Sequence, residues 1–159
     1  MHQLDASRCL IAVEALPALA KLARRNISAA HPGRDYQLVE AAIAYGTKRV
    51  SFDSGAEHIS ARIANEPGQT DESSTVVKAR RLSWILDHFN VGEFSLVMDI
   101  DGAEYALVAK DSGSLKRCRC LIAELHGTAQ QKEMLHATLA TTGLRLIETK
   151  HSVVAYRRD

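Results

Sequence analysis

The chain has 159 residues, of which 46% are hydrophobic, and its 20 lysines and arginines are matched by 19 aspartates and glutamates. This length and composition are enough for one hydrophobic core, so we expect a single domain over residues 1–159. The formal net charge of +1 gives no electrostatic basis for binding nucleic acid or an anionic membrane. Partners must therefore be inferred from local sites.

The cysteines and the apolar runs indicate the compartment. Cys9, Cys118 and Cys120 are odd in number and lie in or beside apolar stretches, which is typical of reduced thiols in the core rather than of disulfides. No apolar run approaches the roughly 18 residues that a membrane-spanning helix needs, and the N-terminal segment lacks the apolar core of a signal peptide. We therefore expect a cytoplasmic protein without a membrane span.

The first elements are predicted to be a strand, a helix and a second strand. Residues 8–15 (RCLIAVEA) form a short apolar run, typical of a strand covered on both faces. A helix with Pro17 in its first turn follows and ends at Pro32 and Gly33. Residues 35–45 (DYQLVEAAIAY) then predict another strand.

A hairpin and a polar loop come next. Apolar residues alternate on both sides of the turn Asp53–Gly55 within residues 50–63, which predicts a β-hairpin. Residues 65–74 (NEPGQTDESS) are polar and rich in turn formers, so they predict a mobile loop.

The second half of the chain alternates helices with strands. Apolar residues from Leu82 to Phe89 share one helical face, which predicts a helix. The strand 94–100 (FSLVMDI) then leads into a helix from about Ala103 to Leu115.

The last four predicted elements are a strand, a helix and a pair of strands. The run 118–126 (CRCLIAELH) predicts a buried strand, and the following helix has Thr128 and Gln131 as a capping box and Gly143 as its stop. Residues 144–158 predict an antiparallel strand pair. The whole pattern favours an α/β fold of Rossmann-like type, with a mostly parallel sheet, helices on both faces and an antiparallel C-terminal pair.

Acidic residues stand where the predicted parallel strands stop. Glu14, Asp99, Asp101 and Glu124 each fall at or near a strand's carboxyl end, where ligands bind in such sheets. Asp99 and Asp101 are two residues apart and therefore on the same side of the strand, and His126 follows Glu124 at the same spacing. We expect these side chains to line one edge of the sheet.

Two other roles compete for these residues. Asp101 and Glu104 have the D-x-x-E spacing of a helix N-cap and its reciprocal partner, which is a structural role. Asp99, Asp101, Glu124 and His126 could instead hold magnesium or calcium, because most of their donors are hard oxygens. Strand-end spacing sets no coordination geometry, so we assign no metal site from sequence.

The residues FSLVMDIDGAEYALV, followed after a helix by CLIAELH, resemble the FkbM family of S-adenosylmethionine-dependent methyltransferases. The family pattern is a strand ending in Asp-x-Glu-Gly-Ala-Glu and a later strand ending in Glu-x-His. Here Asp101 replaces the family's glutamate and Met98 its common lysine. The resemblance extends over nearly the whole chain.

The resemblance also implies cofactor contacts. Glu14 lies where an acidic residue binds the ribose hydroxyls of S-adenosylmethionine, and Ala15 follows it where the family's Glu-Pro-Asn continues. Ala42 would lie near the adenine, and Asp99 is expected at the cofactor as well. Family members also have a strand and a glycine-rich turn before this point, whereas the sequence here contains no G-x-G motif. We expect that the 159-residue chain alone binds the cofactor weakly or not at all.

Two functions follow from this resemblance. The first is O-methyl transfer to a hydroxyl of a small molecule, such as a sugar, a lipid or a secondary metabolite. Asp99 or His126 would then remove the proton, and Asp101, Glu104 and Glu124 would shape the acceptor pocket. The second is a non-catalytic remnant or interaction module, in which a partner or a second copy of the chain covers strand edges left exposed by the missing strand.

Overall fold

The structure of the protein is a computed structural model that describes residues 9–53, 61–63 and 74–159. The chain divides into two compact units. Unit 1 lies within Met1–Ala42 and Thr47–Ala79, and unit 2 comprises Ile43–Gly46 and Arg80–Asp159. We describe each unit by itself.

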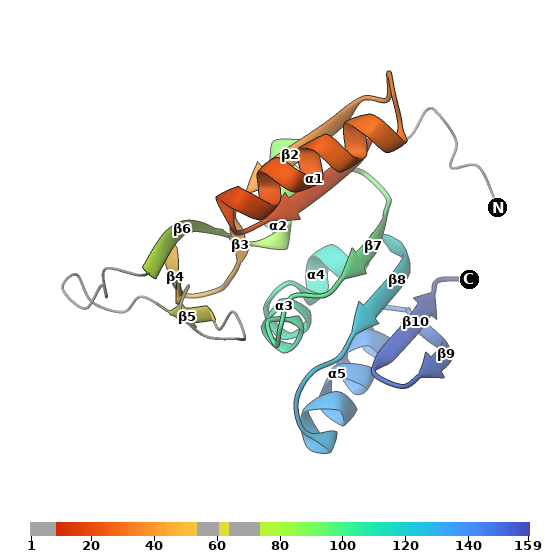
Figure 1. Ribbon diagram of the computed structural model, residues 1–159. Coiled ribbons are helices and arrows are strands. Elements are labelled where there is room, and N and C mark those ends of the chain that lie inside the picture. The colour runs from red at the N-terminus through yellow and green to blue at the C-terminus, as the bar shows by residue number, and fades with distance from the viewer. Residues whose placement is uncertain (1–8, 54–60, 64–73) are drawn as a thin grey trace. The chain divides into compact units, whose positions relative to one another are not determined.

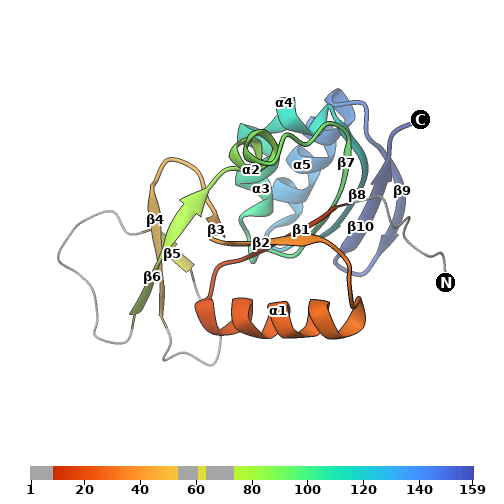
Figure 2. The same cartoon turned by 90° about the horizontal axis from the view of Figure 1, so that it is seen from above.

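Unit 1 begins with a parallel strand pair joined by a helix. Strands β1 (Leu10–Glu14) and β2 (Tyr36–Glu40) pair in register from Leu10 opposite Tyr36 to Glu14 opposite Glu40. Helix α1 (Pro17–Ala30) connects them and runs alongside the pair (Figures 1 and 2). Proline suits the helix start because a first-turn residue needs no backbone donor. The predicted strand and helix are confirmed.

The first strand is less covered than predicted. The side chains of Leu10, Ile11 and Ala12 are half-buried, and Val13 is 36% exposed. In the described part of unit 1 a single helix, α1, packs on a sheet of two strands, so an apolar run does not by itself ensure burial on both faces.

A second sheet contains the predicted hairpin. Its strand order is β3-β6-β4-β5. The strands are β3 (Ala42–Ile43), β4 (Arg49–Asp53), β5 (Ala61–Ile63) and β6 (Ser74–Arg80). Strands β4 and β5 pair antiparallel, with Val50 opposite Ile63, which confirms the hairpin. Most of the predicted turn, residues 54 and 55, and most of the predicted loop, residues 65–73, lie outside the described residues.

Two details of this region differ from the predictions. The strand predicted over residues 35–45 is divided at Ala41 into β2 and β3. Strand β6 was not predicted, although its β-branched residues Thr75, Val76 and Val77 favour a strand.

Unit 2 is built on a four-stranded sheet of order β7-β8-β10-β9. Its strands are β7 (Phe94–Met98), β8 (Cys118–Glu124), β9 (Arg145–Lys150) and β10 (Val153–Arg157). Strands β7 and β8 are parallel, and β10 is antiparallel to both β8 and β9. The antiparallel C-terminal pair is confirmed. The prediction of one mostly parallel sheet was too strong, because the described strands form small sheets of mixed direction.

Four helices complete unit 2: α2 (Leu82–His88), α3 (Glu104–Lys110), α4 (Ser112–Leu115) and α5 (Ala129–Thr141). Figures 1 and 2 show α3 and α5 on the same face of the sheet. On the other face Val97 is 76% exposed and Ile122 is 39% exposed. Helices on both faces are therefore not seen in the described part of this unit.

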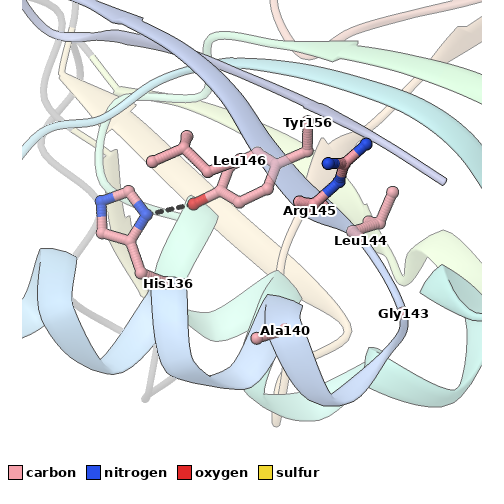
Figure 3. Close-up of a pocket in the computed structure, with 7 residues that line it drawn as sticks. All are labelled: His136, Ala140, Gly143, Leu144, Arg145, Leu146 and Tyr156. Atoms are coloured by element: carbon pink, nitrogen blue, oxygen red, sulfur yellow. Dashed lines mark hydrogen bonds between the residues drawn. The ribbon is translucent and has the colours of Figure 1, made fainter. Parts of the chain in front are cut away.

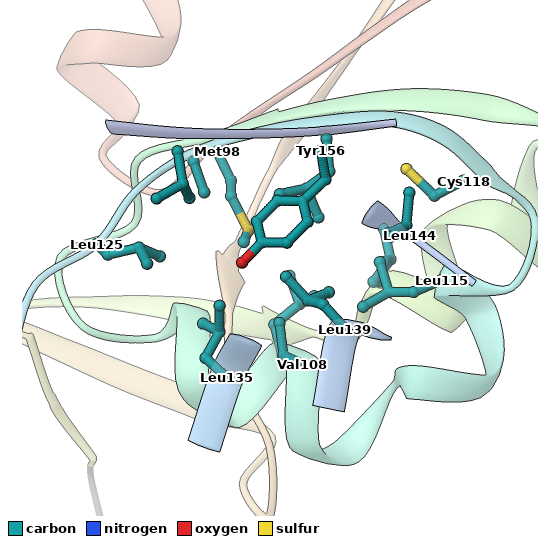
Figure 4. Packing of buried hydrophobic residues seen from close by; sticks show 14 of the residues in the cluster. Met98, Val108, Leu115, Cys118, Leu125, Leu135, Leu139, Leu144 and Tyr156 are labelled. Carbon is teal, nitrogen blue, oxygen red and sulfur yellow. The ribbon is translucent and has the colours of Figure 1, made fainter. Parts of the chain in front are cut away.

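The core of unit 2 lies between the sheet and these helices. Tyr156 on β10 points from the sheet toward Leu135 and Leu139 on α5 (Figure 4). The side chains of Leu121 and Leu139 are 0% exposed. This packing fixes the ends of β7 and β8 relative to α3, which matters for the site described below.

Local signals set the helix boundaries. In α5 the Thr128 hydroxyl accepts from the N–H of Gln131, whose side chain accepts from the N–H of Thr128, so the predicted capping box is confirmed. Gly143 follows with φ +86°. The helix predicted over residues 103–115 is divided at Asp111, whose Oδ2 accepts from the Tyr45 hydroxyl.

Two further sequence expectations can be compared with the structure. Cys9, Cys118 and Cys120 are free thiols, but the prediction that they lie in the core holds only for Cys118, because Cys9 is exposed and Cys120 is half-buried. In the described ranges, no helix has the length and apolar character needed to cross a membrane.

Candidate functional site

The parallel strands β7 and β8 end side by side. Met98, the last residue of β7, is opposite Ala123 on β8. The chain that leaves β7 carries Asp99 and Asp101, and the chain that leaves β8 carries His126. The fold of unit 2 thus brings together side chains that are 25 to 27 positions apart in the sequence.

Asp99, Asp101 and His126 form a group that we call the Asp–His cluster. His126 Nε2 lies 4.0 Å from Asp99 Oδ1 and 4.0 Å from Asp101 Oδ1. The side chains of Asp99 and Asp101 are 63% and 77% exposed, and that of His126 is 38% exposed. The cluster is therefore open to a ligand from solvent.

Glu104 holds the imidazole of His126 at its Nδ1 atom. Its side chain is 0% exposed, and its Oε1 lies 3.1 Å from His126 Nδ1 and accepts from the N–H of Ile100 at 3.2 Å. A carboxylate partner at Nδ1 favours the tautomer or ion with a proton on that nitrogen. The other ring nitrogen, Nε2, is left facing the two aspartates.

The surrounding carboxylates change the pKa of His126. The hydrogen bond with Glu104 raises the pKa above its ordinary value, and the charges of Glu104, Asp101 and Asp99 act in the same direction. Partial burial opposes the shift without cancelling it.

The backbone of His126 is held as well. The Tyr105 hydroxyl donates to the carbonyl of His126, and burial, with the Glu104 charge, raises the pKa of Tyr105. Gly127 follows with φ +100°, and a Cβ at this position would lie 2.5 Å from Gln131 Oε1 and 3.2 Å from Tyr105 Cε2. Glycine is therefore required next to His126. Sequence reasoning missed Tyr105 and Gly127, although Gly127 directly follows the Glu-x-His pattern.

The capping role considered for Asp101 and Glu104 is not what the structure shows. The residue before α3 is Ala103, which makes no side-chain cap, and Glu104 is the first helical residue. Asp101 has φ +47° and Gly102 has φ +93°, so the chain turns through the left-handed region before the helix begins. This turn moves Asp101 away from the cap position and toward His126.

Glu124 does not join the cluster. Its Oε1 accepts from the hydroxyl of Ser152 at 2.8 Å, which ties the end of β8 to the turn before β10. Asp99, Asp101 and His126 therefore come together as predicted from the sequence, Glu104 acts beneath them, and Glu124 points to a different partner.

Glu14, Ala15 and Ala42, the remaining predicted site residues, belong to unit 1. Glu14 ends β1, and its Oε1 accepts from the N–H of Leu16 at 2.9 Å. A carboxylate has about four acceptor positions, so Glu14 can still accept from two ribose hydroxyls. Ala42 is 8% exposed in β3. Glu14 thus keeps acceptor positions that hydroxyl groups could use, and the sequence has no G-x-G turn.

A cavity lies between α5 and the C-terminal strands, apart from the Asp–His cluster. It has a volume of about 430 Å³, and Figure 3 shows His136 and Tyr156 pointing toward one another across it. The Tyr156 hydroxyl is hydrogen-bonded to His136 Nδ1, and burial raises the pKa of Tyr156 to about 12. Arg145, which also lines this cavity, pairs with Asp159.

The comparison with protein families decides the identity of the chain. Residues 1–144 match the methyltransferase FkbM domain. The chain belongs to the FkbM methyltransferase family. The match covers 144 of the 159 residues and includes Glu14, Ala42 and the whole Asp–His cluster. No curated protein and no solved structure matches the chain with significance.

Membership of the FkbM family indicates the type of fold and the methyl donor. FkbM domains are methyltransferase domains, so a Rossmann-like methyltransferase fold and S-adenosylmethionine as methyl donor are implied for this chain. The resemblance of the strand-end residues to this family is thereby confirmed, and the acceptor is not given by the match.

Proposed function

We propose that the protein transfers a methyl group from S-adenosylmethionine to a hydroxyl of a small molecule, and that the Asp–His cluster is where the hydroxyl is activated. The observation that supports this proposal is the imidazole of His126, held at Nδ1 by the fully buried Glu104 and directed through Nε2 at two exposed aspartates. This is the arrangement of an oriented general base.

S-adenosylmethionine, when bound, supplies an electrophilic methyl group on sulfur. In this chain Glu14 is the residue that would accept hydrogen bonds from the ribose hydroxyls, and Ala15 and Ala42 are expected beside the cofactor. The acceptor must lose its hydroxyl proton as the new carbon–oxygen bond forms. Asp99 and His126 are the two groups of the cluster that can take this proton, and Asp101 adds negative charge that favours the protonated imidazole.

Other residues of unit 2 hold His126 and Asp101 in position. Tyr105 and Gly127 fix the backbone of His126, and the turn at Asp101 and Gly102 brings the Asp101 carboxylate toward the ring. Holding the acceptor in line is expected to supply most of the rate enhancement, and a general base adds about 10²- to 10⁴-fold.

The test is the formation of S-adenosylhomocysteine by the purified chain when pools of sugars, hydroxylated lipids or phenolic metabolites are added. We expect acceptor-dependent product that falls about 10²-fold or more in Asp99→Asn and His126→Asn. Asp87→Asn, an exposed aspartate on α2, is the matched control and should keep full activity. Equal activity in all three variants would contradict the role of the cluster.

A second candidate is a non-catalytic interaction module of the same family. The exposed Val97 on β7 and the position of β7 at the edge of its sheet favour it, because an uncovered edge strand can pair with another chain. In this case a partner or a second copy would be needed for cofactor binding. Normal folding without any cofactor binding or product, at any protein concentration, would favour the module over the enzyme.

A further inference from the structure

We propose that the Asp–His cluster binds a divalent cation of the Mn²⁺ type, with Asp99 Oδ1, Asp101 Oδ1 and His126 Nε2 as its protein ligands. These three atoms lie within 4.8 Å of one another. Two carboxylate oxygens and one imidazole nitrogen, open to solvent on the remaining sides, form a ligand set with free positions for water or substrate.

Glu104 provides the independent observation for a cation. Its side chain is 0% exposed, and its Oε1 contacts His126 Nδ1 and the N–H of Ile100, which lies between the two aspartates in sequence. Its second oxygen, Oε2, is buried and has no hydrogen-bond partner among the described residues. A buried carboxylate with one oxygen unpaired requires positive charge nearby.

The protein itself supplies little of that charge. Within the described part of the chain, His126 is the only basic side chain that pairs with Asp99, Asp101 or Glu104. Asp99 and Asp101 are mostly exposed to water, whereas the buried Glu104 has only the imidazole of His126 as a charged partner among the described residues. A divalent cation on the open side of His126 would compensate the exposed aspartates directly and Glu104 through the ring.

The contact between Glu104 and His126 also has the form that metal-binding histidines show. Such a histidine donates its other ring N–H to a carboxylate, which fixes the tautomer and makes the ligating nitrogen more basic. With Nδ1 bound to Glu104, Nε2 is the free ligand atom. The buried pair is thus the fixed part of the site, whereas the two exposed aspartates can move.

The distances show what must change on binding. Neighbouring ligands of an octahedral ion with bonds of about 2.1 Å are about 3 Å apart, so the 4.0 Å separations must close by about 1 Å. Asp99 and Asp101 are mostly exposed and can supply this movement by side-chain rotation. Imidazole favours Mn²⁺ over the strictly oxygen-preferring Ca²⁺, while two carboxylates keep the site from being a typical zinc site.

For methyl transfer the consequence rests on the proposed function. A hydroxyl bound to the cation loses its proton more easily. Of the two groups proposed above to take this proton, Asp99 is the one that stays available while His126 Nε2 is a ligand. The proton would then pass to Asp99, whose second oxygen, Oδ2, stays free of the cation. The negative acceptor oxygen forms its bond to the methyl carbon as the carbon–sulfur bond breaks.

The direct test is a titration of the full chain with Mn²⁺ alone, followed by calorimetry and by the electron paramagnetic resonance signal of free Mn²⁺. We expect one Mn²⁺ per chain and weaker binding of Ca²⁺. Asp101→Asn and His126→Asn should weaken Mn²⁺ binding at least 10-fold, and Asp87→Asn should leave it unchanged. Asp101 is 77% exposed, so its variant tests the site without threatening the fold.

Glu104→Gln tests the role of the buried carboxylate. Glutamine keeps the shape and can still accept from Nδ1, but it removes the negative charge, so Mn²⁺ affinity should fall about 10- to 100-fold. Circular dichroism of the same sample identifies any loss of folding. No binding at millimolar Mn²⁺, or equal binding in Asp101→Asn and His126→Asn, would overturn the cation site.

The outcome for the cation is separable from that for the enzyme. If methyl transfer proceeds in a chelator and Mn²⁺ does not bind, the cation site is wrong and the proposed function stands. If Mn²⁺ binds through these residues and no methyl transfer occurs with any acceptor, the cation site stands and the proposed function fails.

Discussion

At the scale of single residues, the site depends on a few positions where the choice of amino acid is restricted. Asp99, Asp101 and His126 could be singled out from the sequence because they follow two buried strands at period-two spacing. Glu104 could be named from its spacing, but its role could not. Whether a carboxylate caps a helix or supports a histidine depends on side-chain packing between segments, which local spacing does not encode.

Gly127 gives the first prediction. Its φ of +100° is strained for any residue with a Cβ, and a Cβ there would also displace the end of the Gln131 side chain and press on Tyr105. Gly127→Ala should therefore lower the free energy of unfolding by about 1 to 3 kcal/mol, measured by urea denaturation. Gly92→Ala is the matched control, because a Cβ there meets nothing within 4 Å, and its effect should stay within about 0.5 kcal/mol. Equal losses in the two variants would refute the close packing beside His126.

Cys118 gives a prediction about pH. Its side chain is 0% exposed, and burial raises the pKa of its thiol from 9.0 to about 11. A thiol reagent at pH 8 should therefore label the exposed Cys9 and leave Cys118 unmodified in the folded protein. Rapid labelling of Cys118 under native conditions would contradict its position in the core.

The raised pKa of Cys118 also makes the free energy of unfolding depend on pH. The unfolded chain loses the thiol proton at lower pH than the folded chain, so the contribution of Cys118 is complete below pH 9 and is lost as the pH rises toward about 11. The free energy of unfolding of Cys118→Ala should show a smaller decline over this range than that of the unchanged chain.

At the scale of elements, the sequence predicted best where a local signal was strong. Helix α1 with its proline, helix α5 with its capping box and the hairpin β4–β5 all formed as expected. The break between α3 and α4 was not predicted; it lies at Asp111, which accepts from Tyr45, 66 positions away in the sequence.

Helix α2 gives a test of core packing. Leu86 is 4% exposed and belongs to the apolar core of unit 2. Leu86→Ala should cost about 2 to 5 kcal/mol of unfolding free energy, since it removes buried methyl groups and leaves a cavity. Met134→Ala on α5 is the control, because Met134 is 65% exposed, and should change stability by less than about 0.5 kcal/mol. Similar effects of the two changes would be incompatible with the described packing.

The contact that divides α3 from α4 can be tested separately. Asp111 Oδ2 accepts from the Tyr45 hydroxyl at 2.8 Å and from the N–H of Ser83 at 3.1 Å, and burial with this bond raises the pKa of Tyr45. Tyr45→Phe removes a hydrogen bond to a charged group and should cost about 1.5 to 3 kcal/mol. The hydroxyl of Tyr36 makes exposed contacts, so Tyr36→Phe should have little effect on the thermal midpoint. An unchanged midpoint in Tyr45→Phe would mean that the bond contributes nothing.

At the scale of the whole molecule, the alternation of strands and helices indicated the α/β class, and the family match agrees with it. The sheets could be deduced only in part. The antiparallel pairs β9–β10 and β4–β5 join neighbouring segments and were predicted, whereas the antiparallel pairing of β10 with β8 depends on contacts far apart in the sequence. The sequence therefore predicted the order of elements better than the direction and coverage of the strands.

We propose that this FkbM chain uses S-adenosylmethionine and that Glu14 accepts hydrogen bonds from the ribose of the cofactor. A residue-resolved NMR titration of the chain with the cofactor tests it most directly, because NMR detects even weak binding. We expect saturable shifts at the backbone amides of Glu14, Ala15 and Ala42, and a 10- to 150-fold loss of affinity in Glu14→Ala, which corresponds to about 1.5 to 3 kcal/mol for hydrogen bonds to a charged group. Saturable shifts that avoid these three amides, or identical titrations of the unchanged chain and Glu14→Ala, would contradict the role of Glu14.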